Sequence, residues 1–451
     1  MIRARYLVGL PALALAAAAT VSASSPAQSP RTTTPTFTRD VLPILQKSCQ
    51  DCHRPGYIAP MSLLSFEDAR PWARSIRSRV STRQMPPWHI DKTVGIQHFK
   101  NDRSLTEEQI DTIVRWVDAG APKGDPADAP PQRTFTDDNV WNFAKLFGPP
   151  DLVLKSQPYT VKPVQQDAWW RPSTPTGLTE PRWVRAIEIH PSTVAGRKVT
   201  HHALARLQQD EGGSRAGGSD DDADAAIGGL FMEWAVGKQG EIMRPNSGKL
   251  MLPGSRIVWD VHYHAIGEEI TDSVEIGVYF YPKDEVPKFR QTLALFNVVA
   301  GGSRNIDIPP NSTFVTQATH VLRQPGRMEN FQPHMHLRGK AMEIEAVYPD
   351  GRSEVLSYVN NYNFNWHVNY LYDDDYAPLL PKGTVLKLTA WYDNTTANRN
   401  NPDPEQWVGY GDRTVDEMGH AWINITYLSD ADFQAEVAKR KARSTPSINP
   451  Q

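Results

Sequence analysis

The spacing of hydrophobic residues differs between two regions of the chain, and in the first region it is the spacing of a helix. Apolar side chains recur at i, i+3, i+4 and i+7 at Ile110, Ile113, Val114 and Val117. Thr106 precedes this stretch with capping-box spacing to Gln109, and Gly120 stands where a helix would end. We therefore predict a helix between Thr106 and Gly120, and a second, short amphipathic helix over residues 38–45.

The second period is two residues long and belongs to the C-terminal part of the chain. It is clearest in the four segments 273–281, 340–348, 384–392 and 421–428. In the second of these, Met342 and Ile344 alternate with Glu343 and Glu345. Many short strands separated by Pro, Gly and Asn turns are typical of sandwiches. The pattern predicts a multidomain protein in which a small all-α domain precedes an all-β sandwich region.

Composition narrows the class of protein. The 451 residues suffice for two to four domains, and 39% are hydrophobic, as in globular proteins. With 48 basic and 51 acidic residues the net charge is −3, so we expect no nucleic-acid partner. Two cysteines exclude a disulfide scaffold. In contrast to its two cysteines, the chain has 13 histidines, and ten of them lie between residues 190 and 420.

The N-terminus has the features of an export signal. Basic residues precede an apolar run over residues 6–19, and small residues at 21–23 fit a cleavage site. We predict a signal peptide at 1–23, a flexible tether at 24–35, and a periplasmic or secreted protein. The alternative is a retained anchor, but the run is shorter than the ~20 residues that a spanning helix needs and contains Pro11. No transmembrane segment is expected in the mature chain.

Cys49-Gln-Asp-Cys52-His53 is the C-x-x-C-H pattern of covalent c-type haem attachment. Two thiols would bind the haem vinyl groups, and the histidine that follows would supply an imidazole to the iron. A zinc site would need more thiolates than this chain has. A thioredoxin-like C-x-x-C would lie in a βαβ setting, which the sequence lacks. We therefore predict one covalent haem c.

The sixth iron ligand has several candidates. Met85 lies in Gln-Met-Pro-Pro-Trp-His, and Met61 in Ala-Pro-Met is its rival. His89 and His98 are further possibilities, and we predict Met85. The Met-Pro-Pro sequence resembles the axial-methionine loop of class I cytochromes c, and residues 36–125 as a whole are similar to that family. Prolines are frequent beyond this domain, and we place a linker at 126–150.

Histidines occur in metal-ligand spacing along the β region. The motifs are His201-His202, His262-Tyr-His264, His334-Met-His336 and Glu417-Met418 before His420. In a strand, residues i and i+2 share a face, so each H-x-H can form a two-pronged ligand. Imidazole suits copper, zinc, iron or nickel, and a thioether favours copper. Adjacent histidines point to opposite faces of a regular strand, so His201 and His202 need a bend or different ring nitrogens to share a metal. We assign no metal to His190, His320 and His367.

The order HH, VHYH, HMHLRGK and Glu-Met resembles the copper type II, ascorbate-dependent monooxygenases, which include peptidylglycine α-hydroxylating and dopamine β-monooxygenases. The resemblance implies two jelly-roll-like domains that face each other across a solvent cleft, at 151–285 and 286–432, with a tail at 433–451. It implies an electron-storing copper on His201, His202 and His262. It implies a catalytic copper on His334, His336 and Met418, and it makes His264 a neighbour of the first copper rather than a ligand.

These features together predict an exported copper-dependent monooxygenase with two copper ions and one haem c. Its partners would be O2, an unknown organic substrate whose C–H bond is hydroxylated, and a small-molecule or protein electron donor. The tethered haem would supply electrons to the first copper and then to the second, because a short tether keeps the donor at high local concentration. The alternatives are a periplasmic haem and copper protein that transfers electrons or binds copper without oxygenase activity, and a zinc-loaded structural sandwich.

Overall fold

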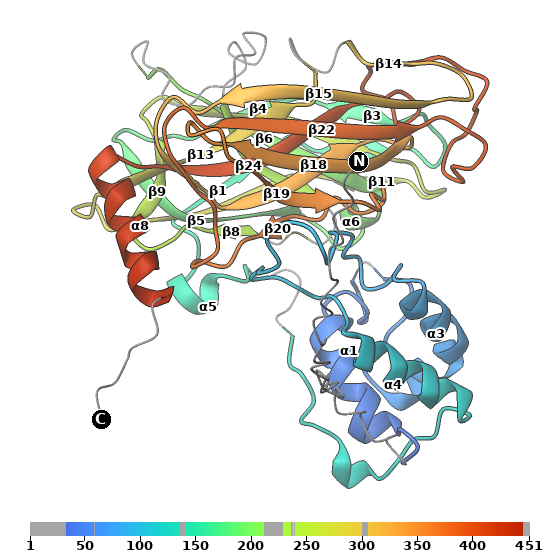
Figure 1. The fold of residues 1–451 in the computed structure, drawn as a ribbon. Helices are drawn as coiled ribbons and strands as arrows, with labels where there is room; N and C mark the ends of the chain where they lie inside the picture. Colours follow the sequence, from blue (N-terminus) through green and yellow to red (C-terminus); the bar gives the residue numbers. More distant parts are fainter. Residues whose placement is uncertain are drawn as a thin grey trace, which may run out of the picture. The chain divides into compact units, whose positions relative to one another are not determined.

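The chain is mainly β-structure in a computed structural model, with 37% of residues in strands and 17% in helices (Figure 1). The structure describes residues 33–57, 59–135, 141–211, 229–235, 238, 240–299 and 305–444. The predicted signal peptide and residues 24–32 of the predicted tether lie outside these ranges. Among the described residues, no helix has both the length and the apolar character needed to span a bilayer.

Short helices make up the region before residue 125. They are η1 (Phe37–Val41), α1 (Leu42–Ser48), α2 (Phe66–Ala69), η2 (Arg70–Trp72), α3 (Ala73–Ser81) and α4 (Glu107–Asp118). The predicted capping box is present on α4, because the Thr106 side chain accepts from Gln109 N–H and the Gln109 side chain accepts from Thr106 N–H. The apolar faces enclose one core around Phe37, Leu45 and Trp116, so both predicted helices are confirmed.

The strands between residues 150 and 285 form a sandwich. One layer contains β1 (Leu152–Lys155), β12 (Val274–Phe280), β5 (Arg182–Pro191), β8 (Gly240–Ile242) and β9 (Ser247–Met251). The other contains β3 (Ala168–Trp170), β4 (Ser173–Pro175), β10 (Arg256–Tyr263), β6 (Thr200–Gln208) and β7 (Gly229–Ala235). A small ribbon pairs β2 (Tyr159–Val161) with β11 (Ile270–Asp272), and the one-turn helix α6 (Gly196–Val199) precedes β6. Ile276 of β12 and Trp259 of β10 are fully buried in the core between the layers.

A second sandwich follows. Its outer layer contains β15 (Thr313–Val321), β22 (Val385–Asp393), β18 (Gly339–Val347) and β19 (Ser353–Val359). Its inner layer contains β13 (Phe289–Asn297), β24 (Gly419–Tyr427), β17 (Asn330–Met335), β16 (Gly326–Met328), β20 (Tyr370–Leu371) and β21 (Leu379–Leu380). A ribbon pairs β14 (Asp307–Ile308) with β23 (Val408–Gly409). Ile344, Leu388 and Ile423 are fully buried between the layers. The four predicted strand segments are confirmed as β12, β18, β22 and β24.

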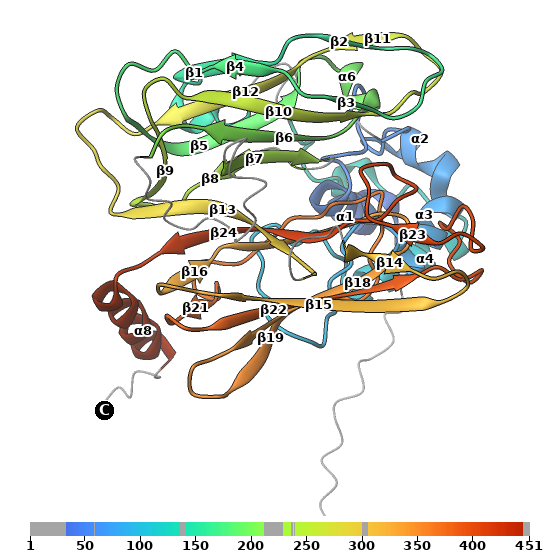
Figure 2. The ribbon, with the colours of Figure 1, turned by 90° about the horizontal axis from the view of Figure 1, so that it is seen from above.

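One layer of each sandwich belongs to the same sheet. Strand β13 pairs with β9 in parallel at Phe289 and Arg290, and with β24 from Gln291 to Asn297 (Figure 2). Because side chains alternate along a strand, each sheet has a second face turned away from its own core. Leu204, Leu230, Leu293, Leu295 and Trp422 pack together on these second faces and join the two sandwiches.

Part of the predicted haem domain belongs to the second sandwich instead. Trp88, Ile90 and Phe99 are buried in the core that contains Ile344 and Leu388. Isolated antiparallel bridges, Ile90 to Val359 and Phe99 to Tyr372, hold this segment. Its apolar side chains cover the end of the second sandwich. For this reason, the prediction of a separate domain over residues 36–125 does not describe this segment fully.

The predicted linker and tail contain local structure. Residues 126–150 include η3 (Pro126–Asp128) and α5 (Ala144–Phe147). The predicted tail overlaps α8 (Asp430–Ser444), the helix that follows β24. Acidic side chains in its first turn and basic ones in its last suit the helix dipole.

Candidate functional site: the C-x-x-C-H loop and a histidine cluster

The C-x-x-C-H motif forms a compact loop directly after α1. The N–H groups of Cys52 and His53 donate to the Cys49 carbonyl at 3.1 and 3.0 Å, so the motif turns back on itself. Both cysteines are free thiols. His53 Nδ1 lies 3.3 Å from the Met61 carbonyl oxygen. When Nδ1 donates to that carbonyl, Nε2 is left as the nitrogen that can bind a metal.

The four candidates for the sixth iron ligand lie in different places. Met61 packs against the helical core together with Cys49, whereas Met85 follows α3 and is half-buried. His89 and His98 contact the second sandwich: His89 N–H donates to Tyr370 at 3.1 Å, and the His98 ring stacks on Tyr376.

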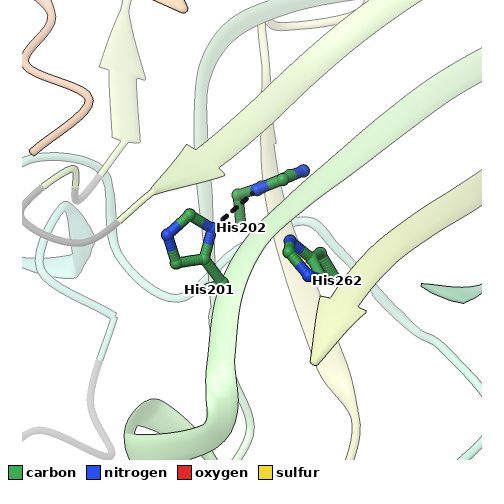
Figure 3. Close-up of side chains that lie close together, drawn as sticks. All are labelled: His201, His202 and His262. Carbon is green, nitrogen blue, oxygen red and sulfur yellow. Dashed lines mark hydrogen bonds between the residues drawn. The ribbon is translucent and has the colours of Figure 1, made fainter. Parts of the chain in front are cut away.

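Three of the predicted copper ligands converge. His201, His202 and His262 offer nitrogen atoms that all lie within 4.8 Å of one another, and they form the first histidine set (Figure 3). Among the described residues, this is the one such group of three potential ligands. The Nδ1 atoms of His201 and His202 are 3.1 Å apart. His262 is 3% exposed, and its Nδ1 has no hydrogen-bond partner among the described residues.

A β-bulge allows the adjacent residues His201 and His202, which would point to opposite faces of a regular strand, to lie on the same side. In the pairing of β6 with β10, His202 is opposite His262, but Tyr263 is opposite Thr200, so His201 is an extra residue on β6. Such a bulge bends a strand and re-aims its side chains, which allows both imidazoles to face His262. On the other face of β10, Ile257, Trp259, Val261 and Tyr263 are fully buried.

Asp167 is a residue of the site that the sequence did not reveal. Its Oδ2 lies 3.3 Å from His262 Nε2, and its Oδ1 lies 2.7 Å from Nδ1 of the exposed His264. Thr414 also donates to Asp167 Oδ2 at 2.8 Å. A carboxylate on one imidazole nitrogen orients the ring so that the other nitrogen can bind metal. The loop before β3 carries no motif that would have pointed to this residue.

The second sandwich contributes His334 and His336, whose ring centroids are 5.3 Å apart. They are 1% and 4% exposed. Strand β17 pairs with β24 so that His334 is opposite His420 and Met335 is opposite Gly419. One further step of this register would place Met418 opposite His336, where directly opposed side chains share a face. Tyr392 holds Met418 in this position by donating to its carbonyl at 3.0 Å.

Two more histidines join this group. The His334 ring centroid is 4.5 Å from that of His420 and 4.6 Å from that of His367. We call His334, His336, His367 and His420 the second histidine set. His420 lies beside the Glu-Met motif and could be suspected from its strand position. His367 has no H-x-H spacing, lies in the loop between β19 and β20, and was predicted to be structural.

The two sets are in contact, which corrects the expectation of a solvent cleft between them. The ring centroids of His202 and His334 are 5.7 Å apart, and those of His201 and His367 are 5.4 Å apart. Polar bonds reinforce the leucine contacts between the sandwiches: Gln332 donates to Glu233 at 3.1 Å, and Asn424 donates to Glu241 at 3.0 Å. The seven rings therefore form one continuous histidine cluster.

Burial lowers the pKa values of six of these imidazoles. It lowers the pKa of His201 to about 3, and the neighbouring His262 lowers it further. It lowers the pKa of His336 to about 4, although the hydrogen bond to the Asp416 carbonyl acts in the opposite direction. It lowers the pKa of His420 to about 3. Burial also holds the pKa values of His202, His334 and His367 well below 6.5, and their histidine neighbours lower them further. Neutral imidazole is the form that binds metals.

A buried carboxylate fixes the backbone around the second set. Glu417 is fully buried and accepts hydrogen bonds from the N–H groups of His336 at 2.9 Å, Arg338 and Met418. Burial raises the Glu417 pKa to about 8 despite these bonds. The carboxyl group thus ties the end of β17 to the start of β24 and keeps His336 and Met418 at a constant separation.

A cavity of about 590 Å³ connects the two parts of the candidate site. Cys52 and Tyr57 of the C-x-x-C-H loop contribute to its lining, and so do Trp366 and His367. Cys52 of the motif and His367 of the histidine cluster therefore face a common space, although they are 315 residues apart in the sequence.

Comparisons with known proteins do not assign a family. No family model matches the chain, and no curated protein matches it. Among solved structures, the chain is similar to the major capsid protein P2 of bacteriophage PM2, at 11% identity over 59% of this chain and 99% of that one, with a TM-score of 0.27. It is similar to N-glycanase F (PNGase F), at 11% identity over 62% and 96%, with a TM-score of 0.23. It is also similar to the VP2 subviral particle of infectious bursal disease virus, at 10% identity over 64% and 76%, with a TM-score of 0.19.

Proposed function

We propose that the chain is an exported, periplasmic or secreted, copper-dependent monooxygenase that receives electrons through a covalently attached c-type haem. The observation that carries this proposal is the histidine cluster, one member of which lines the same cavity as Cys52. The helical part of the chain thus supplies the residues for a haem, the β-sandwich part supplies the residues for copper, and both face one cavity. The reaction would convert a substrate C–H bond, O2, two electrons and two protons into an alcohol and water.

The first histidine set fits copper by the chemistry of its donors. It offers three imidazoles whose nitrogens lie within 4.8 Å of one another. The buried Nδ1 of His262 would otherwise lack a partner, and a buried polar atom without one is costly. Imidazole ligands suit copper among several metals, and a thioether such as that of Met418 at the second set favours copper.

The motif loop fits a c-type haem. Cys49 and Cys52 would hold the haem covalently, and His53 would bind the iron through Nε2, because Nδ1 faces the Met61 carbonyl. The Met61 backbone would then lie at the Nδ1 edge of the His53 ring rather than at the metal-binding Nε2. This placement supports Met85 as the sixth ligand. Methionine ligation raises a haem reduction potential, so Met85→Ala should lower the potential and Met61→Ala should leave it nearly unchanged in a redox titration.

The side chains around the cluster would control its environment. Copper held there would supply one-electron transfer and activation of O2. Trp169 stacks on His262, Phe364 stacks on His201, and Trp422 packs on His334, so aromatic rings exclude bulk water from the imidazoles. Asp167 orients His262, while Glu417 and Tyr392 position His336 and Met418. The cavity beside His367 has the size of a small-molecule site.

A second candidate function is supported by the close contact of the two histidine sets. Rings 5.7 Å apart leave little room for a substrate between His202 and His334, which suits a haem and copper protein that transfers electrons without oxygenase activity. Both functions predict the same cofactors. They differ in whether O2 is consumed together with an organic molecule.

Metal and haem analysis of the protein purified from its native compartment tests the shared premise. We expect one haem and two coppers per chain. Rapid mixing then tests the electron route: the reduced haem should reoxidise faster with copper and O2 than in the copper-free protein. Oxygen uptake that depends on an organic substrate supports the monooxygenase. Two coppers and rapid haem reoxidation without such uptake would favour the electron-transfer protein, and zinc in place of copper would contradict both.

A further inference from the structure

Asp167 has a carboxylate that contacts both sandwiches. It lies in the loop before β3 of the first sandwich, and its Oδ1 is 2.7 Å from Nδ1 of the exposed His264. Its Oδ2 accepts a hydrogen bond at 2.8 Å from Thr414, a residue of the second sandwich. The same oxygen lies 3.3 Å from Nε2 of His262. A single oxygen atom therefore contacts both a ligand of the first histidine set and the second sandwich.

The loop over residues 409–417 carries this threonine and is closed by its own hydrogen bonds. Glu417 N–H donates to the Gly409 carbonyl at 3.0 Å, and Asp416 N–H donates to the Arg413 carbonyl at 2.9 Å. The side chains of Arg413 and Asp416 also form an ion pair at 2.6 Å. These bonds restrict motion within the loop, so we expect it to move as one unit.

The same loop positions residues of the second histidine set. Nδ1 of His336 lies 3.1 Å from the Asp416 carbonyl oxygen, and the Glu417 carboxyl group accepts from His336 N–H at 2.9 Å. Met418, the predicted thioether ligand, directly follows the loop. A displacement of the loop would therefore move Met418 together with the groups that hold His336.

A metal ion at the first set would strengthen the contact between His262 and Asp167. Nε2 of His262 has no hydrogen-bond partner among the described residues, although Asp167 Oδ2 is 3.3 Å away. A metal bound through Nδ1 keeps the imidazole proton on Nε2, from which it can be donated to that oxygen. A carboxylate that is already held by this bond loses less entropy when it also binds Thr414, so each contact favours the other.

We propose that Thr414 is a positioning residue that couples the two histidine sets. Metal binding at the first set would fix Asp167, and Thr414 would then hold the loop 409–417 against the first sandwich. The inference rests on the proposed copper function and extends it, because the positions of His336 and Met418 would depend on whether the first set has bound its metal.

Amide hydrogen exchange of the loop tests this coupling. The measurement is made on the full chain in a His334→Gln background, which impairs the second set, so that added copper acts on the loop from the first set alone. We expect copper to slow exchange over residues 409–417 by about fivefold or more, the lower range for coupled sites. Thr414→Val, which keeps the side-chain shape but removes the hydroxyl donor, should abolish this slowing, and Thr414→Ser should retain it.

Copper affinity provides the reciprocal measurement. Coupling free energies are equal in both directions, so Thr414→Val should weaken copper binding at the first set by the same factor in competition with a chelator. The matched control is Asp412→Asn, because Asp412 lies in the same loop but pairs at 3.2 Å with Arg171 of the first sandwich. This variant should keep both the copper affinity and the slowed exchange.

Three results would overturn the coupling role of Thr414 and leave the proposed function intact. Copper could bind at the first set without slowing exchange in the loop, it could slow exchange equally in Thr414→Val, or Asp412→Asn could lose the effect to the same extent. A wild-type protein that binds no copper would overturn both proposals.

Discussion

The two histidine sets are built in different ways. The first set comes from one pair of neighbouring strands, β6 and β10, and a single bulge brings its nitrogens within 4.8 Å. The second set comes from two strands and a loop, and its members are up to 86 residues apart, from His334 to His420. Strand pairing alone can preorganise a ligand set, whereas a set that uses a loop depends on the packing of the whole sandwich.

This contrast has a physical basis. Bulge geometry is fixed by backbone hydrogen bonds on both sides, so the first set can keep its shape without a metal. The second set is held partly by the pairing of β17 with β24 and partly by side chains, chiefly the Glu417 carboxyl group and the Gln332 and Asn330 amides. We therefore expect copper binding by the first set to be sensitive to changes in its ligands. Copper binding by the second set should be sensitive to changes in the residues that position it.

Removal of a first-set ligand should have the largest effect. His202→Ala leaves two imidazoles in the set, too few to hold copper firmly, so we expect the copper content to fall from two ions to one per chain and product formation to stop. His264→Ala is the control, because this histidine is exposed and reaches the site only through Asp167. Equal copper loss in both variants, measured by elemental analysis, would show that the first set is not the binding unit.

Replacement of Met418, whose thioether is a predicted copper ligand, should affect the second histidine set without affecting the first. Met418→Ile keeps the volume and apolar character of the side chain but removes the sulfur. We expect product formation to fall about 100-fold, the upper range for loss of a group that supports a metal site, while the copper of the first set remains. Activity at the wild-type level would contradict the role of Met418. Loss of both coppers would show that the two sets bind as a single unit.

The orienting carboxylate of the first set should have a smaller effect. Asp167→Asn keeps the side-chain shape but weakens the contact with His262 Nε2, so we expect copper binding by the first set to weaken about 10- to 100-fold. Asp412→Asn is a matched control, since Asp412 pairs with Arg171 and not with a histidine. Chelator competition measures both, and similar affinities in the two variants would assign Asp167 to structure alone.

Acid should destabilise the metal-free protein gradually. Folding lowers the pKa of His201 and His420 to about 3 and of His336 to about 4, from 6.5. The unfolded chain therefore binds more protons below pH 6.5, and stability is lost as the pH falls from 6.5 toward 4. Each such histidine contributes about 1.4 kcal/mol per pH unit in this window. Urea unfolding at pH 7, 6 and 5 measures the slope, which should be shallower in His420→Gln; equal slopes would contradict the burial argument.

The sequence predicts much of the fold and part of the site, for identifiable reasons. Period-2 alternation identifies β12, β18, β22 and β24, because each buries one face in a sandwich core. It does not reveal that β13 joins two layers, since that pairing involves only two residues of β9. The segment from Trp88 to Phe99 is equally hidden, because its partners are strands more than 250 residues away.

The residues of the candidate site likewise divide into those that the sequence predicts and those that it does not. Spacing in the sequence identifies His201, His202, His262, His334 and His336 as potential ligands, and the structure places all of them in the cluster. Asp167 and His367 escape sequence analysis because each lies in a loop without a motif. The bulge at His201 escapes it as well, because nothing in the residues Thr200 to Ala203 forces an extra residue into the ladder.

That bulge suggests an evolutionary route. If His201 were deleted, Thr200 and His202 would become neighbours, and they already face Tyr263 and His262 in succession on β10. The shortened strand would pair without interruption and would lose a ligand in the same event. Under the proposed function, a single codon separates a plain sheet from a metal-binding one, so relatives of this chain that lack the codon are expected to keep the sandwich without the metal.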